Sequence, residues 1–275
     1  MTEPILAARS VVKSFAKGRW QGWKRQGVRA VDEVDIEVRE GETLAIVGES
    51  GSGKSSLARI LLGLVPPTSG EILYRGRPIE ALSASEKRVF RREIQPVFQD
   101  PASSLNPRMR IETTLGHVLA RHGLATPATM RQVIAERLES VGLTPATDYL
   151  DRYPHQLSGG QQQRIAIARA ICLEPKLVIA DEPLSSLDMS VQAQILDLLI
   201  GLKRRLSLGL VMISHDLNVV ATIADRVAVM YLGKIVEAGP ASEVLSRPQH
   251  SYTKSLLAAR LTADPRLARQ RAGLA

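Results

Sequence analysis

The hydrophobic positions of the chain include three short, continuous apolar runs, Leu44–Val47, Leu177–Ala180 and Leu210–Ser214. Continuous rather than alternating apolar residues are typical of strands buried on both faces of a parallel sheet. An amphipathic helical pattern follows each run, and these patterns cover Lys54–Leu64, Val191–Leu206 and Leu217–Ala224. The repeated order of strand and helix predicts an α/β fold with a mostly parallel, doubly wound sheet.

Two other kinds of segment interrupt this order. Val34–Val38 and Glu71–Tyr74 alternate apolar and polar residues, which predicts half-exposed strands of an N-terminal antiparallel β subdomain. Strand signals disappear between Pro101 and Tyr153, and Met130–Val141 carries a helical apolar stripe. We therefore predict an α-helical subdomain inserted at residues 101–165 of a body spanning residues 5–250, with a basic C-terminal extension at residues 251–275.

Composition narrows the class of protein. Hydrophobic residues make up 44% of the 275 residues and charged residues 23%, which is ordinary usage for a folded globular chain. No stretch approaches the roughly 18 to 20 apolar residues that span a membrane, and the N-terminus lacks the pattern of a secretory signal. The single cysteine, Cys172, excludes a disulfide framework and a cysteine-ligated cluster within the chain. We expect a cytosolic protein whose membrane contact comes through partners.

The chain is basic, with a net charge of +8, and the excess is uneven. Six cations and no acid lie between Ser10 and Ala30, and five cations face one acid from Ser251 to the end. Aromatic residues make up only 4% of the chain, which leaves few platforms on which bases could stack. We interpret the two basic segments as solvated loops and expect no nucleic-acid partner.

A glycine-rich segment, Gly48–Ser55, fits the spacing G-x-x-x-x-G-K-[ST] directly after a buried strand and at the start of a helix. Glycines allow the backbone to wrap around phosphates, so that its N–H groups converge with the positive end of the helix. Lys54 is predicted to reach the β- and γ-phosphates, and the Ser55 hydroxyl to bind Mg²⁺. The alternative is a glycine-rich turn with a capping serine. The residues predicted to bind ATP here are Gly48, Glu49, Ser50, Gly51, Ser52, Gly53, Lys54, Ser55 and Ser56.

Two carboxylates, Asp181 and Glu182, end the second apolar run. This position is the C-terminal edge of a parallel sheet, where ligands bind in such folds. Asp181 is predicted to hold Mg²⁺, and Glu182 to act as the general base that polarises the attacking water. Taken alone, the pair could also be a helix N-cap and a first-turn acid. The phosphate-binding segment upstream favours the functional interpretation.

The segment Leu157-Ser158-Gly159-Gly160-Gln161 is more diagnostic, and with it the chain resembles the ATP-binding-cassette (ABC) ATPases. A serine followed by two glycines at the start of a helix forms an anion-binding concavity, although a plain helix start is the alternative. The resemblance implies the fold of a P-loop NTPase (RecA-like), ATP and Mg²⁺ as ligands, and a signature that acts in trans through these five residues.

Other motifs of that family occur in the family's order. Phe15 resembles the aromatic residue that stacks on adenine, and Gln99 resembles the glutamine that contacts Mg²⁺ and water. Asp188 matches the D-loop that crosses the dimer interface, and His215 matches the switch histidine near the γ-phosphate. Each residue has another explanation when taken alone. Phe15 could be a core aromatic residue and Gln99 a surface amide. Asp188 could be a helix N-cap, and His215 a buried neutral imidazole. The catalytic set that the resemblance implies is Glu182, His215 and Gln99, with Ser55, Gln99 and Asp181 around Mg²⁺.

Three further segments resemble the importers of dipeptides, oligopeptides and nickel, namely Gln99–Arg108, Tyr153–Gln156 and Pro248–Leu257. Ser55–Arg59 resembles the second of the two ATPases that such systems carry. The resemblance implies a dimer with a second ABC ATPase, either a different chain or a second copy of this one. It also implies two membrane permeases, an extracytoplasmic substrate-binding protein that acts through them, and a peripheral place on the cytoplasmic face of the inner membrane.

Three other functions fit the sequence less well. The ATPase half of an ABC exporter is disfavoured by the Gln99–Arg108 segment and the C-terminal segment. A soluble ABC ATPase of DNA repair or translation usually carries a long coiled coil or tandem cassettes, and this sequence has neither. A P-loop kinase does not need Leu157–Gln161.

Overall fold

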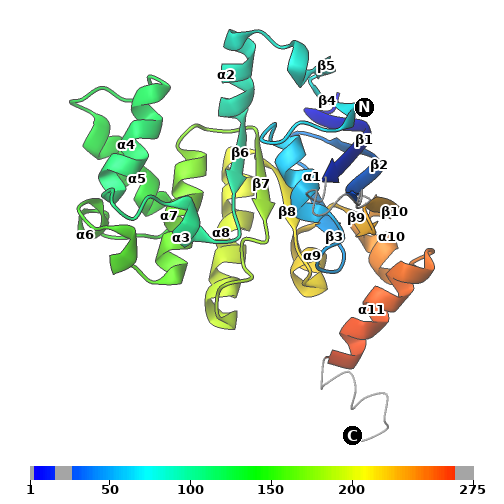
Figure 1. Ribbon diagram of the computed structural model, residues 1–275. Helices are drawn as coiled ribbons and strands as arrows, with labels where there is room; N and C mark the ends of the chain where they lie inside the picture. Colours follow the sequence, from blue (N-terminus) through cyan, green and yellow to red (C-terminus); the bar gives the residue numbers. More distant parts are fainter. Residues whose placement is uncertain (1–2, 16–26, 264–275) are drawn as a thin grey trace, which may run out of the picture. The chain divides into compact units, whose positions relative to one another are not determined.

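The computed structural model describes residues 3–15 and 27–263, with side chains as far as Ala259. The chain divides into two compact units, one formed by Met1–Ile79 with Met212–Ala275 and the other by Glu80–Val211 (Figure 1). Much of the basic segment predicted between Ser10 and Ala30 lies outside the described residues, as does the end of the basic C-terminal extension.

The first unit contains the antiparallel sheet that the alternating patterns predict. Its strand order is β2 (Val28–Val38), β1 (Leu6–Phe15), β4 (Ser69–Tyr74) and β5 (Arg77–Pro78). Ala8 pairs with Ile36 of β2 and Leu6 with Tyr74 of β4. Helix α1 (Lys54–Leu61) contacts β1 and β2 with its buried apolar side chains.

The same unit contains a fully buried strand, β3 (Thr43–Val47), that leads to the candidate phosphate loop. It pairs in parallel with β9 (Arg226–Tyr231), which pairs antiparallel with β10 (Lys234–Pro240). The other helices of this unit are α9 (Leu217–Ile223), α10 (Ala241–Ser246) and α11 (Ser251–Ala263). Their apolar residues share one core with β3 and β9, made of Ala45, Val47, Leu217, Val220, Val227, Val229, Ala241 and Val244.

The second unit carries the second apolar run and the start of the third, which ends in the first unit from Met212 onward. Strand β6 (Ile94–Val97) pairs in parallel with β7 (Leu177–Asp181), and β8 (Gly209–Ile213) follows β7 in the strand order. The helices around them are α2 (Ala84–Glu93), α7 (Gly159–Ile171) and α8 (Met189–Leu206), while a 3₁₀ turn at Ile79–Ala81 marks the chain's entry into this unit. Cys172 is buried at the end of α7, and burial raises the pKa of its thiol to about 12, as expected for a core residue.

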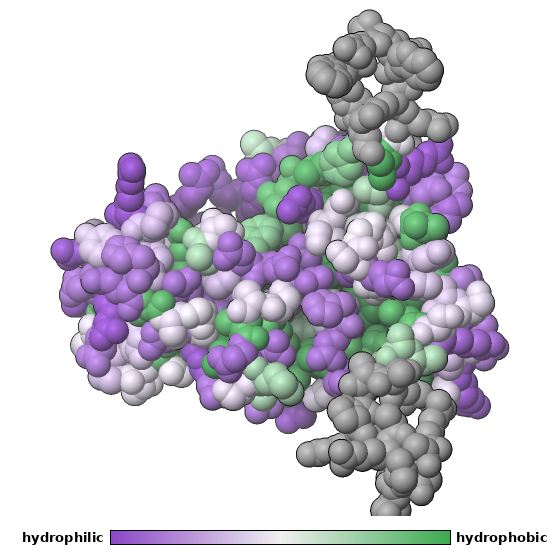
Figure 2. All heavy atoms as spheres, turned by 60° about the horizontal axis from the view of Figure 1, so that its bottom comes forward, coloured by the Kyte–Doolittle hydropathy of each residue, from purple (hydrophilic) through white to green (hydrophobic). Residues whose placement is uncertain are grey.

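Between β6 and α7 the second unit is helical, as predicted. Ile111, Leu115, Ile134 and Leu138 are fully buried and give α4 and α5 their common core. Figure 2 shows that the exposed surface on the left, where these helices lie in Figure 1, is mostly hydrophilic. No helix in the part of the chain that the structure describes is long and apolar enough to cross a bilayer. The elements of this segment are α3 (Pro101–Ser104), α4 (Ile111–Arg121), α5 (Met130–Ser140), α6 (Thr147–Leu150) and the 3₁₀ helix η2 (Pro154–Gln156).

Candidate functional site

The candidate phosphate loop connects the end of β3 to the first turn of α1. Its last glycine, Gly53, is the N-cap of α1 in a left-handed conformation, with φ 107°, and no side chain caps the helix. The first N–H groups of a helix have no partner within the helix, and they carry the positive end of the helix dipole. The start of α1 therefore presents backbone donors that fit an anion.

Two glycines of this loop are required by close backbone contacts. A Cβ atom at Gly48 would lie 2.1 Å from the carbonyl oxygen of Met230, and one at Gly53 would lie 1.9 Å from that of Ala30. No side chain fits at such distances, because real Cβ contacts below 3.0 Å essentially do not occur. By contrast, a Cβ at Gly51 would have nothing within 4 Å, although φ is +81° there. The loop is thus packed tightly at its two ends and open in its middle.

The loop's polar side chains indicate that it binds phosphate. Lys54 is only 4% exposed, and its Nζ donates hydrogen bonds to the carbonyl oxygens of Gly48 (2.8 Å) and Glu49 (2.7 Å). Ser52 is 5% exposed, and its hydroxyl has no hydrogen-bond partner among the described residues. A buried hydroxyl and a buried ammonium beside a helix start that no side chain caps fit the triphosphate of ATP. Ser55 and Ser56 are half-buried in the first turn of α1, where a hydroxyl can reach a cation bound to phosphate.

Two contacts fix the loop from outside. The N–H of Gly233, in the turn between β9 and β10, donates to the carbonyl oxygen of Ser52 at 3.0 Å. The N–H of Glu49 donates to the hydroxyl of Tyr252 at 3.0 Å. No motif predicted that Gly233 contacts the loop, and the family-like segment Pro248–Leu257 was not linked to the loop, because both residues lie about 180 to 200 positions away in the chain.

His215 and Phe15 lie in the same unit as the loop. His215 is exposed directly after β8, and the N–H of the preceding Ser214 donates to the carbonyl oxygen of Ile46 in β3 at 3.3 Å. The histidine therefore leaves the sheet close to the strand end from which the loop begins, and it is not a buried imidazole. Phe15 is 46% exposed at the end of β1, so it is not a core aromatic, and the Lys13 ammonium lies 5.4 Å from its ring centroid.

In the second unit, three predicted site residues gather at the C-terminal ends of β6 and β7. Val97 pairs with Ala180, so Gln99 and Glu182 each lie two residues beyond a paired position. The hydroxyl of Ser186 donates to the carbonyl oxygen of Gln99 at 3.3 Å, which connects the two loops. Asp181 is 6% exposed, and its carboxylate and the Gln99 amide offer the oxygen ligands that Mg²⁺ prefers.

Glu182 has an uncommon backbone conformation for a residue with a side chain, with φ +46°. Such a conformation costs free energy and persists where the surrounding structure imposes it, often at functional sites. The Glu182 carbonyl oxygen accepts hydrogen bonds from the Ser185 N–H (3.3 Å) and hydroxyl (3.1 Å), which maintain the turn after β7. The described residues contain no cluster of three or more His, Cys, Asp or Glu side chains that could hold a metal ion.

The signature Leu157–Gln161 forms the start of α7. Ser158 is the N-cap: its side chain accepts from the Gln161 N–H at 3.3 Å, and the Gln161 side chain accepts from the Ser158 N–H at 3.0 Å. This reciprocal capping box satisfies two helix N–H groups. Ser158 and Gly159 are exposed, Gly160 is half-buried, and Leu157 is buried beneath them.

The signature packs against the D-loop within the same unit. A Cβ atom at Gly160 would lie 2.7 Å from Val191 Cγ1, and one at Gly159 would lie 3.5 Å from Leu187. Asp188 is exposed and caps α8 by accepting from the Val191 N–H at 3.0 Å. That bond and those from Ser190 lower the pKa of the Asp188 carboxyl group. Asp188 is therefore the N-cap of α8, the alternative role named for it above. This cap fixes the start of α8 beside Gly160.

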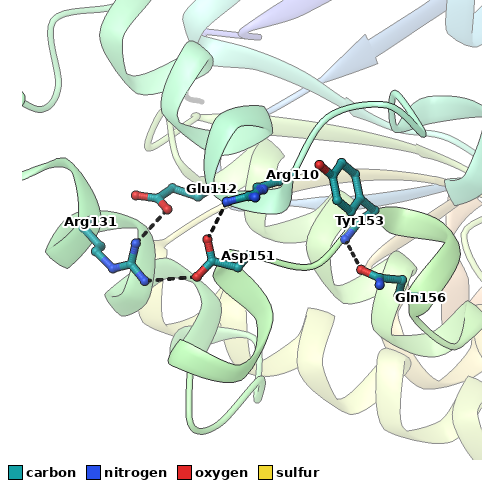
Figure 3. Close-up of polar contacts among 6 residues, drawn as sticks. All are labelled: Arg110, Glu112, Arg131, Asp151, Tyr153 and Gln156. Carbon is teal, nitrogen blue, oxygen red and sulfur yellow. Dashed lines mark hydrogen bonds and ion pairs between the residues drawn. The ribbon is translucent and has the colours of Figure 1, made fainter.

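A chain of ion pairs joins the segment that follows Gln99 to the segment that precedes the signature (Figure 3). Asp151 pairs with Arg110 at 3.1 Å and with Arg131 at 3.4 Å, while Arg131 also pairs with Glu112 at 2.9 Å. The Arg110 guanidinium lies 6.0 Å from the ring centroid of Tyr153, and the N–H of Tyr153 donates to Gln156 at 2.8 Å. These exposed contacts hold the entry to α4 next to the entry to α7.

Comparison with known proteins agrees with these observations. Residues 31–185 match the ABC transporter family. The dipeptide transport ATP-binding protein DppF of Haemophilus influenzae is 45% identical over 268 residues, which cover 98% of this chain and 81% of that protein. The glutathione import ATP-binding protein GsiA of Salmonella paratyphi A is 48% identical over 265 residues, which cover 96% of this chain. The chain spans only 42% of the length of GsiA.

Solved structures show the same fold. The dimeric ATP-binding cassette MJ0796, in a post-hydrolysis state with ADP and phosphate, has a TM-score of 0.74 and is 29% identical to this chain. The likeness covers 86% of this chain and 98% of MJ0796. The predicted fold class is therefore confirmed: an α/β P-loop NTPase with an antiparallel β subdomain and helices inserted in the sheet-forming core.

Proposed function

The chain belongs to the ABC transporter family, and from this premise we propose that it hydrolyses ATP to energise a multi-subunit importer of peptides. The observation that carries the proposal is the phosphate loop, whose uncapped helix start, buried Lys54 and buried Ser52 hydroxyl fit a triphosphate. The signature and the carboxylates of the second unit add the groups that hydrolysis and dimer closure need.

The phosphate loop binds the nucleotide through residues that already face one another. Lys54 exchanges its bonds to the Gly48 and Glu49 carbonyl oxygens for bonds to the β- and γ-phosphates, while the N–H groups at the start of α1 surround the phosphates. The exposed ring of Phe15 stacks on adenine, as its counterpart does in the family.

The residues after β6, β7 and β8 carry the chemistry of hydrolysis. Glu182 accepts a proton from the attacking water, and Gln99 orients that water. His215 donates to the γ-phosphate. Ser55, Asp181 and Gln99 supply oxygen ligands for Mg²⁺, which neutralises charge on the phosphates when it is bound.

The signature serves a second polypeptide. In this family a signature acts on the γ-phosphate that another cassette holds, so ATP joins two cassettes and hydrolysis releases them. Ser158 and Gly160 present the start of α7 to that phosphate, and Asp188 lies beside them at the interface. The partner is a second ABC ATPase, either a related chain or a second copy of this one.

The substrate class and the membrane partners come from the relatives. DppF is named for dipeptide transport and GsiA for glutathione import, and both names describe peptides or peptide-like solutes. We infer two permeases that this chain contacts at the cytoplasmic face of the inner membrane, and an extracytoplasmic binding protein that delivers the solute. Nickel, which the sequence motifs also allow, stays a prediction.

One experiment tests both parts of the proposal. The chain is purified from membranes as wild type, as Glu182→Gln and as Glu174→Gln, and ATP turnover is measured with and without short peptides. Glu174 is a matched control, because it lies in the same unit, also has a positive φ (+50°) and carries an exposed carboxylate that pairs with Arg137 at 2.6 Å. We expect Glu182→Gln to keep its ATP affinity and to lose about 100-fold or more in turnover, whereas Glu174→Gln turns over like the wild type.

The outcomes separate the parts of the proposal. Full turnover by Glu182→Gln would contradict the assignment of the base. A chain that purifies free of membrane proteins would contradict the role in an importer. Turnover that rises with Ni²⁺ but not with peptides would overturn the substrate class and leave the ATPase intact.

A further inference from the structure

The C-terminal segment of the chain contacts the phosphate loop directly. The hydroxyl of Tyr252, at the start of α11, accepts a hydrogen bond from the N–H of Glu49 at 3.0 Å. The two residues are 203 positions apart in the sequence and belong to the same compact unit. Residue 252 lies in the predicted basic C-terminal extension, so this contact gives that segment a specific place at the site.

Several independent contacts hold Tyr252 in position. Its ring stacks on that of Tyr231, with centroids 4.1 Å apart and an interplanar angle of 30°. Its backbone N–H donates to His250 Nδ1 at 3.2 Å. The carboxylate of Glu237, on β10, accepts from the N–H groups of Gln249 (2.8 Å) and His250 (3.1 Å). The chain entering α11 is therefore fixed on β9 and β10, and the hydroxyl has little freedom to move.

The backbone carbonyl group of Glu49 is bound within the loop. Its carbonyl oxygen accepts from Lys54 Nζ at 2.7 Å and from the Ser52 N–H at 3.2 Å. The N–H of Glu49 faces Tyr252, while its carbonyl group faces the residues that would bind phosphate. A group that fixes the N–H of Glu49 therefore also fixes the first turn of the loop around Lys54.

The protonation state of Tyr252 suits this contact. Burial is the largest cause that raises the pKa of its phenol, so the hydroxyl stays neutral at physiological pH. A neutral oxygen accepts from an N–H group without placing a negative charge beside a site for phosphates.

We propose that Tyr252 is a positioning residue for nucleotide binding, whose hydroxyl holds the N–H of Glu49 and keeps the phosphate loop in its binding conformation before the nucleotide arrives. The inference rests on the nucleotide-binding role proposed above. A loop that is ordered in advance loses less conformational freedom on binding, and that gain appears in affinity rather than in the chemical step. The C-terminal segment thereby becomes part of the nucleotide site without touching the nucleotide.

Tyr252→Phe removes the acceptor and keeps the ring. The matched control is Tyr231→Phe, which removes a hydroxyl from the other ring of the same stack. That hydroxyl makes no hydrogen bond within the part of the chain that the structure describes. For the full chain with MgATP, we expect Tyr252→Phe to raise the Kd and KM by about three- to tenfold, as the loss of one hydrogen bond predicts. Its kcat should stay within about twofold of the wild type.

A second readout reports on the contact itself. Amide hydrogen exchange at Glu49 is expected to be slow in the wild type and in Tyr231→Phe, although the residue is exposed, and fast in Tyr252→Phe. Thermal unfolding of each variant checks that it is folded. The wild-type exchange rate needs no variant, so a Tyr252→Phe protein that fails to fold still leaves the inference open to refutation: fast exchange at Glu49 in the wild type would overturn it.

Two results distinguish this inference from the proposed function. A wild-type chain that binds no ATP refutes the proposed function. A wild-type chain that binds ATP, with Tyr252→Phe and Tyr231→Phe equal in Kd, KM and Glu49 exchange, refutes the role of Tyr252 alone.

Discussion

Two glycine-rich helix starts, the phosphate loop before α1 and the signature before α7, differ in how their backbone donors are satisfied. Helix α1 begins at Gly53, and no side chain caps it. Helix α7 begins at Ser158 with a complete capping box, in which Ser158 and Gln161 bond to each other's N–H groups. No side chain therefore competes with an anion at the first helix start, while side chains already accept from two N–H groups at the second.

This difference suits the two roles. The phosphate loop binds its nucleotide within one chain, so a helix start that no side chain caps raises its affinity. The signature meets a phosphate only when a second cassette approaches. Until then Ser158 and Gln161 satisfy the start of α7 themselves, which keeps the exposed helix end stable in the separate chain. A phosphate from the partner must then accept from the remaining N–H groups or displace the Ser158 and Gln161 oxygens that accept from the capped ones.

The glycines of the two segments are also required for different reasons. Gly48 and Gly53 lie against carbonyl oxygens of the backbone, which cannot move without disturbing β9 and β2. Gly160 lies against a side chain, that of Val191, which can be made smaller. A second mutation therefore cannot relieve a substitution of Gly48 or Gly53. A smaller residue at position 191 can relieve a substitution of Gly160.

The largest effect is expected for Gly53→Ala. Its Cβ would lie 1.9 Å from the Ala30 carbonyl oxygen, and φ is +107°, so either the loop or β2 must shift. We expect a cost of about 3 kcal/mol, which is about a 100-fold loss of ATP affinity if the loop gives way. Gly51→Ala is the control: it also has a positive φ but meets no atom within 4 Å, so only the backbone cost of about 1–2 kcal/mol remains. ATP affinity is measured by equilibrium dialysis. Equal affinities of Gly53→Ala and Gly51→Ala would show that the close contact of Gly53 with Ala30 does not matter for binding.

The sequence predicted the strands and helices that carry the motifs. The three apolar runs are β3, β7 and β8, and the helical patterns are α1, α8 and α9, with differences of a few residues at their ends. The prediction succeeded there because strands buried on both faces leave an unbroken apolar signal. These strand signals also gave the position of the loop between β3 and α1. They likewise gave the position of the carboxylates after β7.

Other elements gave weaker signals and were missed. Strand β6 contains Pro96, which is compatible only with a position at the edge of a sheet, and β6 is indeed the last strand in its order. Helix α2 buries only Phe90, so it has no apolar stripe, although its capping box of Ser83 and Glu86 is visible in the sequence. The bond between Glu49 and Tyr252 depends on how α11 packs on the core, and no local pattern encodes that.

A smaller effect is expected for Gly160→Ala. A Cβ there would lie 2.7 Å from Val191 Cγ1, and relieving that overlap costs about 1–3 kcal/mol of stability. Val191→Ala removes the clashing methyl groups, so the double variant should recover most of the loss of stability and of ATP turnover. Urea unfolding of the four proteins gives the coupling free energy. If the two changes are additive, the signature glycine is required for contact with the partner rather than for packing on α8.

The smallest effect is expected for Ser158→Ala, and it separates the cap of α7 from its proposed role in trans. Losing an N-cap hydroxyl costs about 1 kcal/mol of stability. Ser83→Ala is a matched control in the same unit, because Ser83 caps α2 with the same capping box and its hydroxyl accepts from the Glu86 N–H at 3.3 Å. Both variants should therefore lower the free energy of unfolding by similar amounts and leave ATP affinity unchanged. Only Ser158→Ala should also reduce turnover, because only α7 presents its start to the nucleotide of another cassette. Equal turnover in the two variants would mean that the Ser158 hydroxyl is a cap and nothing more.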